Sequence, residues 1–159
     1  MDWLLSTAPT WATLLGFLAA TCSAGMGGVL FRPGGWYRTL AKPAWTPPDW
    51  LFGPVWSVLY LTMGVAAWLV WQRHGWTGAR GALVLFWVQL AFNAAWSPLF
   101  FGLRSPLLGM LDIAALLAVL VATTIAFWRA RRPAGLLFVP YLAWVGYAAA
   151  LNATIWAMN

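Results

Sequence analysis

The stretch at 106–128, PLLGMLDIAALLAVLVATTIAFW, holds 23 residues, of which only Asp112 is charged. A helix needs roughly 20 apolar residues to cross the hydrocarbon core of a bilayer. Pro106 suits the first turn of such a helix, because its missing N–H would have no intrahelical partner there in any case. The stretch therefore predicts a membrane-spanning helix.

Four more apolar stretches lie on either side of this one, separated by segments that carry the basic residues. Charged residues make up only 8% of the chain and hydrophobic residues 63%, whereas about a quarter of a soluble domain is charged. Backbone groups in hydrocarbon must pair within the segment, which favours helices, and the sequence does not show the alternation typical of membrane β-barrels. We predict an all-α membrane protein, a single domain over 1–159 that forms a bundle of five transmembrane helices. The helices are expected at 11–30, 49–71, 79–103, 106–128 and 134–157.

The basic residues give the chain a formal net charge of +6. They are scattered among the predicted loops, so nucleic acid is not an expected partner. Five of them fall on the side of the N-terminus and four on the other side, and this near balance leaves the orientation open. Cys22 is the only cysteine and His74 the only histidine. The sequence therefore predicts no metal site and no required cofactor.

The loop at 32–48 differs from the other loops because it is rich in proline and aromatic residues. Each proline fixes its own φ angle and restricts the residue before it, so the loop is expected to be stiff. Trp36 and Trp45 give it an apolar face. Two interpretations remain open: these side chains lie at the membrane interface, or the loop is a lid over a ligand site.

Aromatic and amide side chains recur at steps of three and four residues along the second, third and fifth predicted helices, and so share one face of each. An amide without a partner in hydrocarbon costs on the order of several kcal/mol, so these faces are expected to contact protein or ligand. Hydrogen bonding between helices is one interpretation. A central pocket for a large, flat, apolar molecule with polar edges is the other. The candidate ligand-binding residues, with two from the loop, are Trp36, Trp45, Phe52, Trp56, Tyr60, Asn93, Trp96, Tyr141, Trp144 and Ala148.

Two further features of the predicted spans have open interpretations. Asp112 is the only acid inside a span, and such acids usually face a partner or a cavity. A structural pair, for example with Arg104, is favoured over a proton or cation site, because no second carboxylate completes a relay. The first helix carries small residues at steps of four, from Gly16 to Gly28, which suit close packing within the chain or across a dimer.

Five short motifs stand at characteristic distances from one another along the chain. They are KPAWTPP at 42–48, FGPVW at 52–56, QLAFNAAWS at 89–97, PYLAW at 140–144 and LN at 151–152. Together they resemble the signature of the tryptophan-rich sensory protein family, also called TspO/MBR, translocator protein or peripheral benzodiazepine receptor family. The resemblance implies a multi-pass integral membrane protein of bacterial type and a homodimer. It also implies porphyrin binding and a regulatory role in tetrapyrrole metabolism.

The resemblance also assigns roles to particular residues. Trp56 and Trp144 match tryptophans associated with porphyrin binding and its light-dependent breakdown. Asn93 matches a ligand-contacting amide, and Ala148 a small residue beside the pocket. Vertebrate members carry a proposed cholesterol motif at the end of the last helix, but its tyrosine and basic positions are alanines here, so sterol binding is not expected.

The expected function is that of a membrane receptor or carrier that binds protoporphyrin-type tetrapyrroles in an intramembrane aromatic pocket. The alternatives are an enzyme that degrades porphyrin in light through Trp56 and Trp144, or a transporter of tetrapyrrole or lipid-like ligands. The sequence shows no nucleophile–base pair, metal cluster or nucleotide motif, so it offers no firm catalytic residue. The lack of an inverted repeat argues against a transporter.

Overall fold

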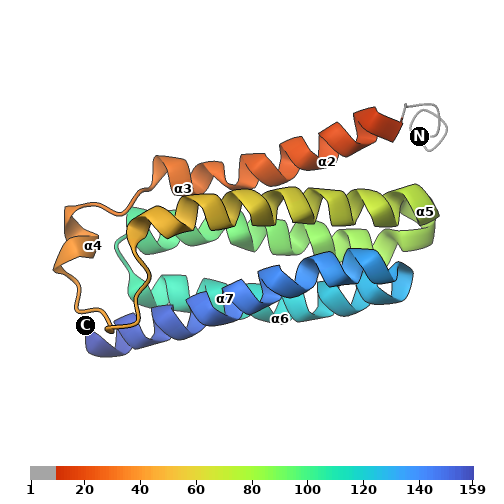
Figure 1. Ribbon diagram of the computed structural model, residues 1–159. Helices are drawn as coiled ribbons and strands as arrows, with labels where there is room; N and C mark the ends of the chain where they lie inside the picture. The colour runs from red at the N-terminus through yellow and green to blue at the C-terminus, as the bar shows by residue number, and fades with distance from the viewer. Residues whose placement is uncertain (1–9) are drawn as a thin grey trace.

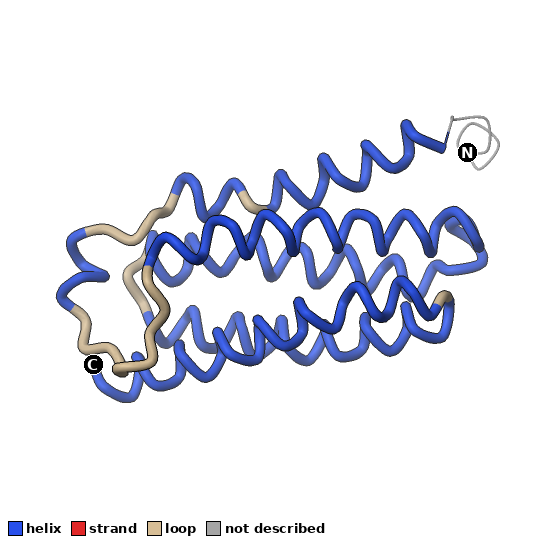
Figure 2. Tube along the Cα trace, in the orientation of Figure 1, coloured by secondary structure: helices blue, strands red, loops and turns tan. Residues whose placement is uncertain are grey.

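The computed structural model describes residues 10–159, which are mostly helical and contain no strand. The long helices run side by side along one axis (Figures 1 and 2). Four helical stretches are long and apolar enough to cross a membrane, and one of them, Asp49–Gly102, is a hairpin of two long halves. The predicted all-α bundle of five spans is therefore confirmed. The elements are α2 (Thr10–Ala24), α3 (Met26–Leu30), α4 (Gly35–Thr39), α5 (Asp49–Ser97), the π-helical turn η1 (Pro98–Gly102), α6 (Pro106–Ala130) and α7 (Arg132–Met158).

The hairpin within α5 is tighter than the sequence suggested. We expected a loop at 72–78, but only Gly75 and Ala79 leave helical geometry, with φ angles of 61° and −126°. Gly75 adopts a positive φ angle, which residues with a Cβ atom avoid. The chain reverses here, where the ribbon turns from yellow to green in Figure 1. The two halves of α5 therefore lie antiparallel beside each other.

The first span breaks at Gly25 into α2 and α3 rather than forming one straight helix. A Cβ added to Gly25 would lie 2.6 Å from the Tyr60 ring, and one added to Gly27 would lie 3.0 Å from the Ala94 carbonyl. Glycine at these two positions thus permits close approach to α5. The span lies on one side of the bundle, against α5 (Figure 1). At Gly16, where the predicted stripe of small residues begins, a Cβ would meet nothing within 4 Å.

The core lies between α5, α6 and α7, whose apolar faces meet. Phe127 on α6 stacks on Phe86 of α5 at 6.1 Å and contacts Phe138 of α7 at 4.9 Å, measured between ring centroids. α6 begins with the expected Pro106, and the Ser105 hydroxyl accepts a hydrogen bond from the Leu108 N–H to cap it. A side-chain oxygen at this position typically stabilises a helix by about 1 kcal/mol.

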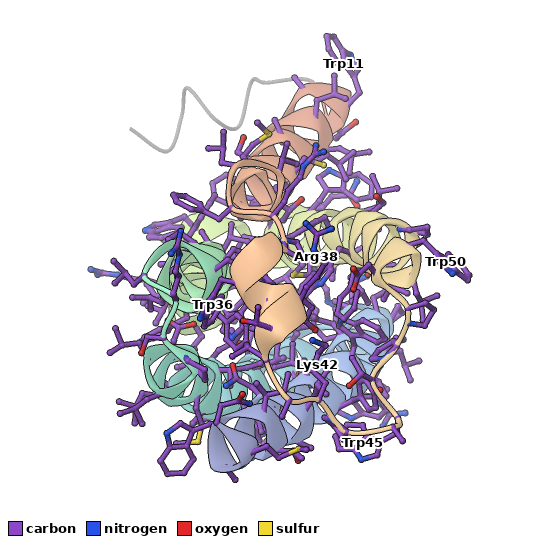
Figure 3. The ribbon with its side chains drawn as sticks, turned by 90° about the vertical axis from the view of Figure 1, so that its left-hand side faces the viewer. Trp11, Trp36, Arg38, Lys42, Trp45 and Trp50 are labelled. Atoms are coloured by element: carbon purple, nitrogen blue, oxygen red, sulfur yellow. The ribbon has the colours of Figure 1, made fainter. Side chains whose placement is uncertain are left out.

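The segment at 32–48 crosses one end of the bundle, and it contains the short helix α4 rather than being a loop throughout. Figure 3 shows α4 lying over the bundle end. The Asn159 amide exchanges two hydrogen bonds with the backbone of Ala41, at 2.9 and 3.0 Å. The Tyr147 hydroxyl donates to the Trp45 carbonyl at 2.7 Å. The segment is therefore held by the C-terminal half of α7 and by the residue that follows it.

Candidate functional site

A cavity of about 750 Å³ lies inside the bundle near the end that α4 covers. Its walls come from the first span, both halves of α5, α6 and α7, and its mouth includes residues of the crossing segment. Binding sites for small molecules typically measure roughly 300–1,000 Å³. The cavity is thus large enough for a ligand with several fused or linked rings.

Most of the candidate ligand-binding residues lie on this cavity, on three different spans. The residues that line it are Phe52, Trp56, Tyr60, Asn93, Trp96, Trp144 and Ala148. As contacts to a ligand, these residues stay predictions.

Three candidates lie elsewhere. Trp36 packs edge-on against Phe100, with ring centroids 5.7 Å apart. Trp45 packs against Tyr147 at 5.6 Å and is 47% exposed. Tyr141 is completely buried behind the cavity wall. The prediction that the two loop tryptophans cover the cavity is therefore wrong in its details, because neither lines it: Trp36 packs on Phe100, which does line the cavity, and Trp45 packs on Tyr147 outside it.

A chain of hydrogen bonds forms the polar part of the wall. The Tyr60 hydroxyl donates to Asn93 Oδ1 at 2.7 Å, and Asn93 Nδ2 donates to the Tyr141 hydroxyl at 2.8 Å. The Tyr141 hydroxyl in turn donates to Gln89 Oε1 at 2.9 Å. Each buried group thereby has a partner, as burial in an apolar interior requires. Asn93 thus bonds between helices and also lines the cavity, and its role as a ligand contact stays a prediction.

A second amide joins three elements nearer to the mouth. Asn152 Oδ1 accepts from the Trp96 indole N–H at 3.1 Å, and its Nδ2 donates to the Pro106 carbonyl at 2.8 Å. A Cβ on Gly109 would lie 2.9 Å from Asn152 Oδ1. The glycine thus leaves room for the amide between α6 and α7. Trp96 is fixed in orientation by this bond and by stacking on Phe100 at 5.0 Å.

The apolar walls are aromatic on two sides. Trp56 stacks on Tyr60, with ring centroids 5.4 Å apart and planes at 27°. Trp144 meets Phe52 edge-on at 5.9 Å. The Trp144 indole N–H is buried and has no hydrogen-bond partner within residues 10–159. A buried donor without an acceptor costs about 1–3 kcal/mol.

The mouth of the cavity is charged. Arg32 and Asp49 both line it, together with Tyr37 of α4. Burial raises the pKa of the Tyr37 hydroxyl, and the Asp49 carboxylate raises it further, so this hydroxyl remains a neutral donor. Lys42 is engaged elsewhere, since its ammonium donates to the Tyr37 and Leu40 carbonyls at 2.7 and 3.0 Å. Arg32 is thus the basic side chain that the structure places at the mouth.

The sequence reasoning missed the contribution of the first span and of Tyr37. Cys22, Gly25 and Gly28 line the cavity, although the small residues were interpreted only as a packing stripe. From the loop, only Trp36 and Trp45 are among the candidate site residues, but Tyr37 is the buried residue of α4. Burial of one aromatic in the pair Trp36-Tyr37 depends on how α4 lies over the bundle, which local sequence does not encode.

Asp112 lies on α6 and is only 7% exposed. Its Oδ2 has no hydrogen-bond partner within residues 10–159, so the expected pair with Arg104 is wrong. Arg104 lies in the exposed turn before α6, where its φ of 53° directs the chain into the helix. Within residues 10–159, no three His, Cys, Asp or Glu side chains come together as a metal site would require.

A comparison with protein families matches residues 9–157 to the TspO/MBR family. The chain belongs to this family. The resemblance seen in its motifs is therefore confirmed, and the match extends over every described helix. Membership of the TspO/MBR family and four apolar stretches of membrane-spanning length identify an integral membrane protein.

Individual TspO/MBR relatives are similar over most of their length. The chain is 47% identical over 133 residues to the tryptophan-rich protein TspO of Chlorobaculum tepidum, covering 80% of this chain and 82% of that protein. It is 44% identical over 148 residues to protein CrtK of Rhodobacter capsulatus, covering 90% and 89%. It is 38% identical over 157 residues to the human translocator protein, covering 96% and 93%.

Proposed function

We propose that this TspO/MBR protein is a membrane receptor or carrier that binds porphyrin-type tetrapyrroles in the cavity beneath α4. One observation carries the proposal: four indoles, a hydrogen-bonded amide and an arginine, brought together from three spans and the crossing segment, border the same 750 Å³ cavity. This combination of residues suits a flat aromatic ring with acidic substituents better than a small polar metabolite.

The apolar walls support the proposal through shape. Trp56 and Trp144 offer broad aromatic faces, and offset or edge-on contacts between aromatic rings add about 0.5–1.5 kcal/mol beyond buried area. The small side chain of Ala148 leaves room for a ligand ring beside α7. A tetrapyrrole placed here would replace water with aromatic contacts on both faces.

The polar groups support it through chemistry. The Asn93 amide lines the cavity as a polar group within reach of a ligand. Arg32 at the mouth can donate to the carboxylates of a porphyrin side chain, and such charge-assisted bonds are stronger than neutral ones. The ring would then lie inside the membrane, with its acidic edge toward the aqueous end.

Light-dependent breakdown of the bound porphyrin is a second candidate function. It is favoured by the position of Trp56 and Trp144 on one cavity, since indole is readily oxidised and both rings would touch the same ligand. Two of the relatives named above are called tryptophan-rich protein and translocator protein, and neither name refers to a reaction. We therefore place binding first and regard breakdown as an additional activity.

The proposal includes the setting in which binding takes place. We infer a bacterial multi-pass protein that acts in regulation of tetrapyrrole metabolism, forms a homodimer and contacts membrane lipid on its outer faces. The porphyrin is inferred to be a ligand rather than a resident cofactor. Sterol and nucleic acid are not among the inferred partners.

Titration of the purified protein with protoporphyrin, followed by tryptophan fluorescence, tests the proposal. We expect saturable quenching with one porphyrin per chain, because Trp56, Trp96 and Trp144 border the cavity. A Trp56→Phe/Trp144→Phe variant should show less of the quenching that saturates, because two of the indoles that line the cavity are gone while Trp50 and Trp96 remain. Quenching that rises linearly with porphyrin and never saturates would contradict the proposal, since it would report only partition into the micelle.

A further inference from the structure

A second cavity, of about 570 Å³, lies at the opposite end of the bundle from α4. This is the end where α5 reverses and α6 passes into α7 (Figure 1). The cavity is bordered by Arg73, Trp128, Arg129, Ala130, Arg131, Arg132 and Pro133. Four arginines thus surround one hollow, and none of them takes part in the tetrapyrrole site.

The positive charge of this cavity has no acid near it among the described residues. Asp49 and Asp112 are the only acids within residues 10–159. At 1.5 Å per residue, Asp49 is about 36 Å from Arg73 along α5, and Asp112 is about 25 Å from Arg129 along α6. Charges at such distances are screened in physiological salt, where the Debye length is about 8 Å. The arginines therefore repel one another without compensation from the described acids.

The turn that carries the arginines is held in place by the backbone. Arg131 Nη1 donates to the Leu69 carbonyl at 3.2 Å, and His74 Nε2 lies 3.0 Å from the Ala130 carbonyl. α7 begins here, and no side chain caps its first turn. This first turn carries the positive end of the helix dipole, next to the positively charged arginines. Basic residues at such an end are unfavourable, and a bound anion would relieve both the dipole and the arginines.

The surroundings favour a lipid over a free anion. Trp128 stands at the rim and is 45% exposed. Exposed apolar residues lie one helical turn from the arginines on the same faces: Ile125 is four residues before Arg129, and Leu136 is four residues after Arg132. Val121 and Val139 are exposed further along the same helices, so an apolar stripe runs from the cavity along α6 and another along α7. A molecule with a phosphate head and acyl chains would fill the cavity and cover the stripes at once.

We propose that this arginine cavity binds the phosphodiester headgroup of an anionic phospholipid, whose acyl chains lie along the outer faces of α6 and α7. Arg129 and Arg132 donate to the phosphate oxygens from the two helices, and Arg73 donates from α5. Basic pockets between membrane helices are known to suit anionic headgroups. The proposal is independent of the tetrapyrrole cavity, which lies at the other end.

Native mass spectrometry of the protein in neutral detergent, with added phosphatidylglycerol or phosphatidylcholine, tests the proposal. We expect one phosphatidylglycerol to stay bound to each chain in preference to phosphatidylcholine. Arg129→Gln/Arg132→Gln should weaken phosphatidylglycerol binding about ten-fold or more, since each basic residue near a membrane surface contributes about 1 kcal/mol. Arg73→Gln, which changes a different helix, should weaken it by a few-fold in its own right.

The matched control is Arg38→Gln/Arg80→Gln, which removes the same charge from exposed residues that border neither cavity. It should bind phosphatidylglycerol as the wild type does. Equal binding by the two double variants, or equal retention of the two lipids by the wild type, would overturn the proposal. Inorganic phosphate that displaces the lipid at an equal concentration would also overturn it, in favour of a site for free anions.

Discussion

The Tyr60 hydroxyl donates a 2.7 Å hydrogen bond to Asn93 Oδ1, which joins the two antiparallel halves of α5 at the wall of the cavity. Asn93 then donates to Tyr141 of α7, so that one amide links three spans. The polar wall of the cavity is therefore also a structural joint. A change to this joint should affect both stability and ligand binding.

Asn93→Leu should lower the free energy of unfolding by about 1–3 kcal/mol, because it leaves the Tyr60 and Tyr141 hydroxyls without their partner. Thermal unfolding in detergent, followed by circular dichroism, measures the change. Gln72→Leu on the same element is the control, since this amide is exposed. If both variants were equally stable, the hydrogen-bond chain would not contribute to the stability of the bundle.

Gly25→Ala should reduce porphyrin binding and lower stability. The new Cβ would lie 2.6 Å from the Tyr60 ring, and this ring cannot easily move because Asn93 and Trp56 hold it. Gly16→Ala places the same methyl group in open space, and it should leave binding unchanged while stabilising the helix by up to about 1 kcal/mol. Thermal unfolding and porphyrin titration of the two variants check both effects. Similar behaviour of the two would show that α3 does not contact Tyr60 as described.

The aromatic stripes were predictable from the sequence, and so was much of the cavity wall. Phe52, Trp56 and Tyr60 recur at the period of a helix, and helical geometry alone places them on one face. The helix boundaries of α6 and α7 extend about two residues beyond the expected ones, because the basic turn at 129–132 remains largely helical. These features depend on local geometry, which the sequence encodes directly.

The mouth of the cavity was not predictable in the same way. Tyr37, and not Trp36, lines it, because the orientation of α4 is set by distant contacts such as those of Asn159 and Tyr147. The missing partner of Asp112 is a further example, since pairing depends on which face of α6 meets α7. Tertiary contacts between segments more than 100 residues apart decide these details.

Ala148→Leu should weaken porphyrin binding about ten-fold, since added methylenes in a packed site cost about 1–3 kcal/mol. Ala150→Leu is the control, because Ala150 is exposed on the outer side of α7 and does not line the cavity. Fluorescence titration of both variants gives the two dissociation constants. Equal affinity in the two variants would place the porphyrin outside this cavity.

Arg32→Gln should weaken binding of a porphyrin dicarboxylate about two- to five-fold, in line with an exposed ion pair of roughly 0.5–1 kcal/mol. It should leave binding of the porphyrin dimethyl ester unchanged, because the ester carries no charge for Arg32 to contact. Arg38→Gln, an exposed change on α4 that does not border the cavity, should affect neither ligand. An equal loss for acid and ester would mean that Arg32 acts on the shape of the mouth and not on ligand charge.

Trp56→Phe/Trp144→Phe separates binding from breakdown. Phenylalanine keeps an aromatic face on each wall but removes the readily oxidised indole, so porphyrin affinity should fall only a few-fold, as the loss of one aromatic contact of about 0.5–1.5 kcal/mol implies. If the indoles mediate breakdown, the loss of porphyrin absorbance in light should slow by far more than the affinity falls.

The rates must be compared at equal occupancy, because free porphyrin also bleaches in light. Trp11→Phe/Trp156→Phe controls for the loss of two indoles, since both side chains are exposed and neither lines the cavity. Equal bleaching rates in the wild type and both double variants would leave Trp56 and Trp144 as binding-site walls, and the protein as a receptor or carrier without this reaction.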